Sequence, residues 1–171
     1  MAETMRESIL EALRDLLASD PEGFFPPAVI DEPDPTGWTA IDGVGPRLTH
    51  ACAVQDGPPP DQLAFVRAGE DDQNCDELEL EAMIAYVVTA APGLGDTAED
   101  LRGARRARRD AGVRRIAGLI SANRNLGLSL EVYAEVRPAQ RDDDVGFKNA
   151  EPGAVALVPV RILYTAASAA D

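Results

Sequence analysis

The sequence contains few of the residues from which most metal sites and nucleophilic sites are built. Its 171 residues include one histidine, two cysteines and only 5% aromatic residues. A structural zinc ion needs about four His or Cys ligands, and a hydrolytic triad needs a histidine held by a folded scaffold. His50 lies in a proline-rich stretch and has only Cys52 close to it in sequence. We therefore expect no metal, no cofactor and no catalytic residue, and we predict that the protein is not an enzyme.

Long hydrophobic runs and positive charge are also scarce. No run approaches the roughly 18 apolar residues of a membrane span, and acids occupy the N-terminal positions where a signal peptide has bases. Thirty acids outnumber 16 bases, which gives a net charge of -14. Such a chain repels free nucleic acid and anionic membranes. We expect a cytoplasmic setting in which Cys52 and Cys75 are free thiols, with a disulfide between them as the open alternative.

The overall composition predicts one folded domain over residues 1–171, because 45% of the residues are apolar and 27% are charged, as in an ordinary globular protein. Residues 3–18 have the hydrophobic spacing of a helix. A second helix is predicted over residues 97–123, with Asp96 as its N-cap and Glu99 completing a capping box. Gly112 is a candidate break in this second helix.

Four segments predict strands, because they are apolar or alternate with period two: 62–67, 77–90, 128–136 and 154–165. Pro159 removes a hydrogen-bond donor from the last strand, so we expect it at an edge or a bulge. The order of elements predicts an α+β fold. Its mostly antiparallel four-stranded sheet would carry two helices packed on one face and a long proline-rich arm.

The arm is the segment 20–61. Nine of the 13 prolines lie between Pro21 and Pro60, which argues against a long helix or a central strand there. The arm nevertheless carries the large apolar residues Phe24, Phe25 and Trp38. We expect these three side chains to pack on the same domain or on a neighbouring subunit. A partly disordered insertion is the alternative, since loops of this length are usually functional or disordered.

Positive charge is concentrated in the second predicted helix, where eight of the 16 bases lie between residues 102 and 124. Four of them follow helical spacing and form one stripe, which consists of Arg102, Arg105, Arg106 and Arg109. The stripe is a candidate subunit interface that would meet acids of the next copy. The alternative is that its arginines pair with acids of the same chain. Under the interface hypothesis, changing Arg105 and Arg109 to glutamate leaves the monomer folded and weakens assembly.

Two further motifs are candidate binding sites. The run 142–144 of three aspartates could hold a divalent cation, but it lacks the spaced pattern of a calcium loop, so a solvated loop is favoured. The segment 41–47 is similar to the glycine hairpin of helix-hairpin-helix modules, which bind a DNA phosphate. That hairpin needs a preceding helix, and the proline-rich residues 32–37 do not supply one.

In its order of elements the chain resembles the tail terminator proteins of long-tailed phages and phage-like particles, the family that includes the lambda minor tail protein U. The likeness covers the helix at 3–18 and most of residues 62–165. It includes the helix that ends in Ile116–Ile120, the strand Leu128–Val136 and the terminal strand Val155–Tyr164. The family has no sharp motif, so the resemblance is one of element order and general residue pattern. The arm and the arginine-rich helix start depart from the family pattern.

The resemblance implies a structural virion protein that is assembled in the host cytoplasm. Copies would form a ring, of six subunits, that caps the tail tube and stops its polymerisation. The ring would contact the tail tube protein on one face and the head connector or neck protein on the other. DNA would be only a cargo that passes through an acidic lumen. The alternatives are a neck or head-completion protein of the same virion, or a helix-hairpin-helix type DNA-binding accessory protein.

Overall fold

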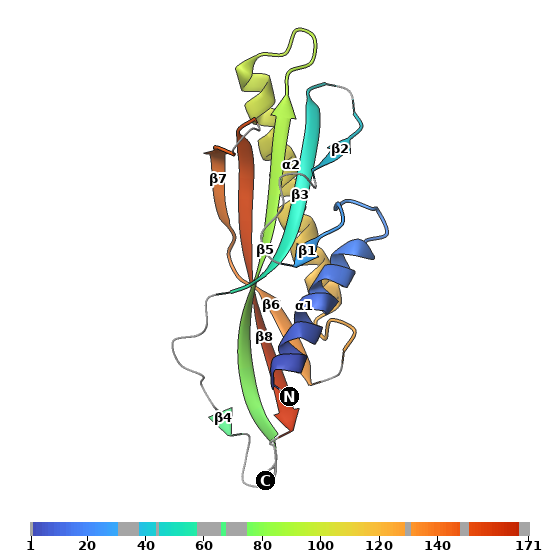
Figure 1. Ribbon diagram of the computed structural model, residues 1–171, viewed down its shortest axis with the longest axis vertical. Coiled ribbons are helices and arrows are strands. Elements are labelled where there is room, and N and C mark those ends of the chain that lie inside the picture. The colour runs from blue at the N-terminus through green and yellow to red at the C-terminus, as the bar shows by residue number, and fades with distance from the viewer. Residues whose placement is uncertain are drawn as a thin grey trace.

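Two long antiparallel strands run along the length of the molecule, and the other elements flank them (Figure 1). The structure is a computed structural model that describes residues 2–30, 38–43, 45–57, 66–67, 75–128, 131–147 and 151–167. The elements within these residues are α1 (Ala2–Ala18), β1 (Val29–Ile30), β2 (Thr39–Ile41), β3 (Arg47–Asp56), β4 (Val66–Arg67), β5 (Cys75–Ala91), α2 (Ala98–Ala122), β6 (Val132–Val136), β7 (Gln140–Val145) and β8 (Gly153–Ala167).

The eight strands of the described residues form one mixed sheet around β5 and β8. These two strands pair from Cys75 opposite Ala167 to Thr89 opposite Gly153. Each is long enough to share its outer edge between two shorter strands. Strands β3 and β4 pair with β5, while β6 and β7 pair with β8. On the far side of β3, β2 pairs antiparallel and β1 pairs parallel.

Period-two alternation along β5 and β8 divides their side chains between the two faces of the sheet. One face holds Leu80, Ile84 and Tyr86 of β5, and these belong to the same buried cluster as residues of both helices. Helix α1 packs on β1 and β3, and α2 packs on β5, β6 and β8. The helix residues that enter the cluster are Ile9, Leu10, Leu13 and Leu17 of α1 and Val113, Ile116 and Ile120 of α2. The core therefore lies between this face and the two helices.

The predicted fold class is wrong in the size and composition of the sheet. Much of the predicted arm belongs to the sheet, because β3 pairs with β5 from Arg47 opposite Ala91 to Asp56 opposite Ala82. The prolines mark the ends of the arm strands and do not interrupt them: Pro46 directly precedes β3, and Pro27 lies two residues before β1. Proline density over the whole segment hid a ten-residue strand that contains no proline. The protein remains α+β, but it is rich in sheet.

The other strand predictions had mixed outcomes. Only Val66–Arg67 of the segment 62–67 forms a described strand, and the rest of that segment lies outside the described residues. Strand β6 begins at Val132 because the chain first turns through Leu126 and Gly127, both with positive φ. The aspartate run 142–144, which was predicted as a solvated loop, lies in the edge strand β7. Pro159 lies in β8 where β6 gives way to β7, and its carbonyl accepts the backbone N–H of Arg137 on that side.

Helix α2 begins one residue later than the sequence predicts. Thr97 is the N-cap, and Asp100 completes the capping box. The carboxylate of Asp96 instead accepts the backbone N–H of Gly93 at 2.7 Å, which fixes the turn before the helix. The helix continues without a break through Gly112, which lies against the ring of Tyr86.

Candidate interaction surfaces

The arginine stripe of α2 lies beside the edge strand β7, and it forms ion pairs there with the aspartates of the run 142–144. Arg102 and Arg105 both bind the carboxylate of Asp144. Arg106 and Arg109 both bind the carboxylate of Asp143. The Nη1 atom of Arg109 also donates to the carbonyl oxygen of Asp142 at 3.0 Å. These contacts join α2 to β7 across a sequence separation of more than 30 residues.

The burial of the stripe differs along its length. The side chains of Arg105 and Arg109 are only 9% and 5% exposed, whereas those of Arg102 and Arg106 are 50% and 45% exposed. Hydrogen bonds from Arg106 and Arg109 lower the pKa of Asp143 to about 2. Pairing within the chain therefore occupies the whole stripe. A contact with another subunit stays a prediction, and only Arg102 and Arg106 leave surface for it.

This arrangement changes the expected effect of charge reversal. Removing one partner of a buried ion pair leaves an uncompensated charge, which is strongly destabilising. Because Arg105 and Arg109 are buried and paired, changing both to glutamate is expected to destabilise the monomer. This outcome corresponds to the alternative in which the stripe pairs with acids of the same chain.

The two phenylalanines of the predicted arm pack around Tyr86 of β5. Phe25 is 9% exposed and meets the tyrosine ring edge-on, with ring centroids 5.4 Å apart. Phe24 is half-buried, and the guanidinium of Arg108 lies over its ring at 3.6 Å from the centroid. The Nη2 atom of Arg108 also donates to the backbone carbonyl of Phe24 at 2.8 Å. Both phenylalanines are thus held by their own domain.

Tyr86 also joins a polar chain inside the core. The Nε atom of Arg108 donates to the tyrosine oxygen at 3.2 Å, and that hydroxyl lies 2.9 Å from Nδ1 of His50. If the Tyr86 hydroxyl donates its proton to Nδ1 of His50, the Nε–H of Arg108 and the O–H of Tyr86 each have an acceptor. Nδ1 then carries no hydrogen, and the imidazole is neutral. Burial and, to a lesser extent, the charge of Arg108 lower the pKa of His50 to about 4. His50 is therefore a structural, uncharged residue at neutral pH.

Trp38, the third predicted interface residue, precedes β2 and packs on Phe147, which follows β7. The two rings meet edge-on with centroids 5.7 Å apart. Strands β2 and β7 lie toward opposite edges of the sheet. Trp38 is half-buried, and its buried Nε1 atom has no hydrogen-bond partner among the residues that the structure describes. Like the phenylalanines, it contacts its own chain.

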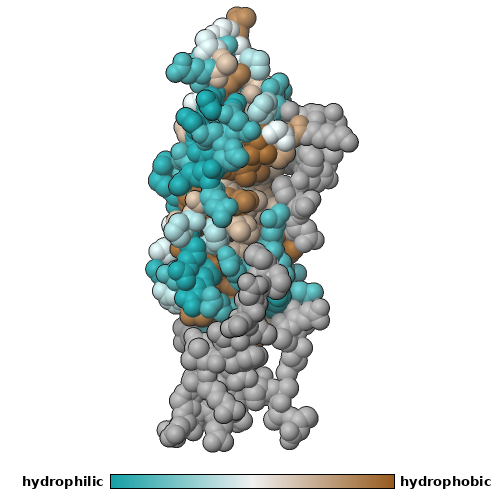
Figure 2. Space-filling view, turned by 90° about the vertical axis from the view of Figure 1, so that its left-hand side faces the viewer, coloured by the Kyte–Doolittle hydropathy of each residue, from teal (hydrophilic) through white to brown (hydrophobic). Residues whose placement is uncertain are grey.

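The sheet face away from the helices contains an apolar depression, which we call the sheet-face groove. Its volume is about 680 Å³, and its floor includes Ala85 and Val87 of β5, which are almost fully buried. Val155 and Leu157 of β8 and Phe147 line it as well. Gln55, Gln140, Arg141, Asp142 and Val145 complete the lining. Figure 2 shows hydrophobic surface next to hydrophilic surface in the upper half of the molecule, on the side of β7.

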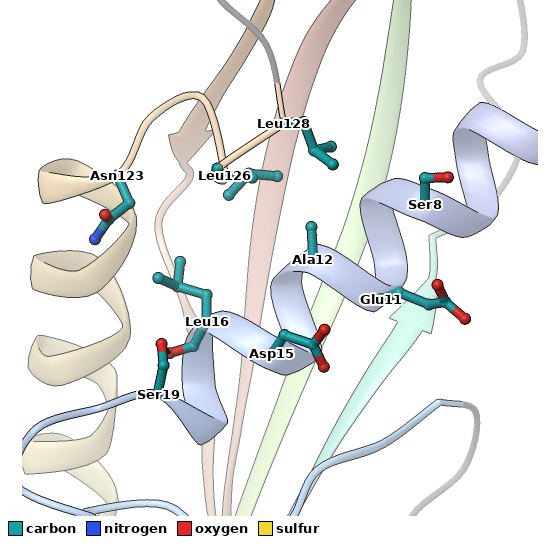
Figure 3. A pocket seen from close by; sticks show the side chains of 10 residues that line it. Ser8, Glu11, Ala12, Asp15, Leu16, Ser19, Asn123, Leu126 and Leu128 are labelled. Carbon is teal, nitrogen blue, oxygen red and sulfur yellow. Dashed lines mark hydrogen bonds between the residues drawn. The ribbon is translucent and has the colours of Figure 1, made fainter.

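A second depression, which we call the helix-edge groove, lies between α1 and the turn that connects α2 to β6 (Figure 3). Ala12 and Leu16 of α1 face Leu126 and Leu128 of the turn across it. Its volume is about 550 Å³, and Leu128 is 40% exposed. Ser8, Glu11, Asp15, Ser19, Asn123 and Gly127 complete the lining.

Neither the sheet-face groove nor the helix-edge groove was predicted from the sequence. The sheet-face groove requires β3 and β7, neither of which was predicted, and the helix-edge groove requires the turn that shortens β6. The sequence held one signal of the sheet-face groove. Residues 83–88 are apolar on both faces of the strand, which indicates that both faces are covered.

The segment 41–47 joins two strands, since Ile41 ends β2, Arg47 begins β3, and the two strands pair antiparallel. It therefore lacks the flanking helices of a helix-hairpin-helix module. Among the described residues, no three or more His, Cys, Asp or Glu side chains are grouped to hold a metal ion. Within the same part of the chain, neither helix is long and apolar enough to cross a membrane.

The sequence matches no protein-family model, and it matches no curated protein.

Proposed function

We propose that this protein is a ring-forming structural subunit of a virion, a tail terminator that caps the tail tube and joins it to the head connector. The observation that carries the proposal is the pair of grooves on different parts of one subunit. A cyclic ring with head-to-tail contacts needs two different patches on each subunit, because each copy offers one patch to each neighbour. The sheet-face groove can serve as one of these patches. The helix-edge groove is built from different elements and is available for the tail tube protein or the head connector.

The order of elements also supports the proposal. An N-terminal helix, a long strand, a second helix and a long terminal strand are the parts on which the resemblance to tail terminators rests. In the structure these parts are α1, β5, α2 and β8. Strands β5 and β8 form the centre of the sheet, and the two helices pack on one of its faces. The additional strands β1, β2 and β3 come from the segment in which the sequence departs from the family pattern.

Charge supports passage of DNA through such a ring. The net charge is -14, and all four arginines of the stripe form ion pairs with Asp143 or Asp144 of the same chain. The exposed acids Glu7, Glu11 and Asp15 lie on α1. A surface of this kind repels the DNA backbone, so DNA can move past it without being held. A neck or head-completion protein would use the same properties, and the site of the ring in the virion separates the two.

Native mass spectrometry over a range of protein concentrations tests the proposal. The expected result is a closed species of six chain masses, which electron microscopy would show as a ring with a central opening. Binding to double-stranded DNA at low salt is measured beside it, and none is expected. A chain that stays monomeric at every concentration would contradict ring formation. Salt-sensitive DNA binding by the monomer would favour an accessory DNA-binding protein instead.

A further inference from the structure

The loop between β5 and α2 presents one large hydrophobic side chain to solvent. Leu94 is fully exposed, and its neighbours are Pro92, Gly93 and Gly95. The loop lies at one end of the long axis of the molecule (Figure 1). Leu94 therefore protrudes from small or rigid neighbours and has no larger side chain next to it in sequence.

The loop around Leu94 has a defined conformation. The backbone N–H of Gly93 donates to the carboxylate of Asp96 at 2.7 Å, and the backbone N–H of Asp96 donates to the carbonyl oxygen of Gly93 at 3.3 Å. Gly95 has a φ of 84°, a conformation that glycine adopts without strain. Asp96 is followed by the capped first turn of α2. A loop backbone held in this way loses little conformational freedom when Leu94 binds a partner, and preorganisation of that kind favours association.

The sheet-face groove offers the complementary shape. It has an apolar floor and a volume of about 680 Å³, which is ample for a leucine side chain. Leu94 is fully exposed, so it does not fill the groove of its own subunit. A protruding apolar side chain and an apolar groove elsewhere on the same molecule form a head-to-tail contact between copies.

The loop that carries Leu94 is acidic, and the groove has one partly exposed arginine at its rim. The acids Asp96, Glu99 and Asp100 flank Leu94 in the loop and in the first turn of α2. Arg141 lines the groove next to Asp142, and its side chain is 47% exposed while it pairs with Asp110 of the same chain at 3.3 Å. Opposite charges around an apolar contact set the orientation of the partner.

We propose that Leu94 of one copy inserts into the sheet-face groove of the next copy, and that this knob-and-groove contact repeats around the ring. The inference rests on the proposed function, because it specifies the contact between subunits. In this contact the β5–α2 loop of one copy supplies the protruding side chain. The sheet face away from the helices, at β5 and β8 of the next copy, receives it. The helix-edge groove then remains free for another component of the particle.

Two classes of variant test the contact. Leu94→Asp removes the apolar knob, and Leu94→Met retains one. Leu157→Glu places a charge in the groove, while Arg141→Glu reverses the charge at its more exposed rim. Leu128→Asp is the matched control, because it adds a carboxylate at an exposed leucine of the helix-edge groove. Thermal unfolding of each variant establishes that the subunit is folded, and Arg141→Glu tests the groove if Leu157→Glu does not fold.

The expected result is that Leu94→Asp and the groove variant each weaken self-association at least about tenfold. Leu94→Met and Leu128→Asp should assemble as the unaltered protein does. An equimolar mixture of Leu94→Asp with the groove variant should give a two-copy species, because only one intact knob can meet one intact groove. A mixture that gives no such species would contradict the pairing of these two surfaces.

The failure of this inference differs from the failure of the proposed function. If the unaltered protein forms rings and Leu94→Asp forms them equally well, the knob is wrong and the ring stands. The inference is also overturned if Leu128→Asp, and not Leu94→Asp, abolishes the rings, since the contact then lies at the helix-edge groove. If the unaltered protein never associates, both proposals fail.

Discussion

Gly112 of α2 lies directly against the ring of Tyr86 of β5, so closely that a Cβ at position 112 would overlap with the Cδ1 and Cε1 atoms of the ring. The helix can approach the sheet here only because residue 112 has no side chain. Tyr86 is fully buried, and the two phenylalanines and His50 surround it, so the ring has no free space into which to move.

We predict that Gly112→Ala lowers the free energy of unfolding by about 1–3 kcal/mol, because overpacking a filled core costs that much. Gly118→Ala on the same helix is the matched control. A Cβ at 118 would meet no atom within 4 Å, so this change should be neutral or should stabilise by up to about 1 kcal/mol through helix propensity. Urea unfolding measures both changes. Equal stability of the two variants would contradict the close contact with Tyr86.

The ion-pair network between α2 and β7 predicts unequal effects for two arginines of one helix. Arg109 is 4% exposed and binds Asp110, Asp143 and the carbonyl of Asp142, whereas Arg114 is exposed and has no described ion pair. Arg109→Met should lower the free energy of unfolding by about 1–3 kcal/mol, because it leaves bonded groups without a partner. Arg114→Met should change the same quantity by less than about 0.5 kcal/mol. Urea unfolding of the two variants measures the difference, and equal losses would show that the network contributes nothing to folding.

His50 predicts a loss of stability in mild acid. Its pKa falls from about 6.5 in the unfolded chain to about 4 in the folded protein, because the side chain is buried and Arg108 lies near it. Between these two values only the unfolded chain takes up the proton, so the free energy of unfolding falls as the pH is lowered from 6.5 to 4. The loss is about 2–3 kcal/mol at most, because each pKa unit corresponds to about 1.4 kcal/mol.

The variant His50→Gln isolates this effect. Glutamine can accept the hydroxyl proton of Tyr86 but does not titrate. Chemical unfolding at several pH values should show a shallower dependence between pH 6.5 and 4 for the variant than for the unaltered protein. The paired Asp143, whose pKa is about 2, contributes stability that is present above pH 4 and is lost as the pH falls toward 2, below the range of the His50 effect. Parallel curves for the two proteins above pH 4 would contradict a neutral, buried His50.

Cys52 predicts an unreactive thiol. It is a free cysteine that is 2% exposed, and burial raises its pKa to about 12. Since the thiolate is the reactive form, a thiol reagent should modify Cys52 only when the protein unfolds. In a Cys75→Ser variant, which leaves one thiol, labelling at neutral pH should be slow in buffer and rapid in denaturant. Labelling of Cys52 at the rate of a free thiol in buffer would contradict its burial.

The sequence by itself determined the elements that have a strong local signal. Hydrophobic spacing placed α1 and α2, because a helical face repeats every three to four residues wherever the helix packs. Alternation placed β5 and β8, since both long strands have one buried face along most of their length. The position of α2 was predicted to within one residue at its start, where Thr97 and Asp100 form the capping box in place of Asp96 and Glu99.

Tertiary structure decided the partners of these elements. The sequence indicated a basic stripe and a run of three aspartates as separate features, and only the pairing of β7 with β8 brings Asp143 and Asp144 to α2. Strand β3 was not predicted, because the segment around it is rich in proline although the strand itself contains none. Its pairing with β5 is a contact between distant segments, which local pattern does not indicate. Both grooves arise in the same way. Local periodicity reports which face of a segment is buried, but it carries no information about which distant segment covers that face.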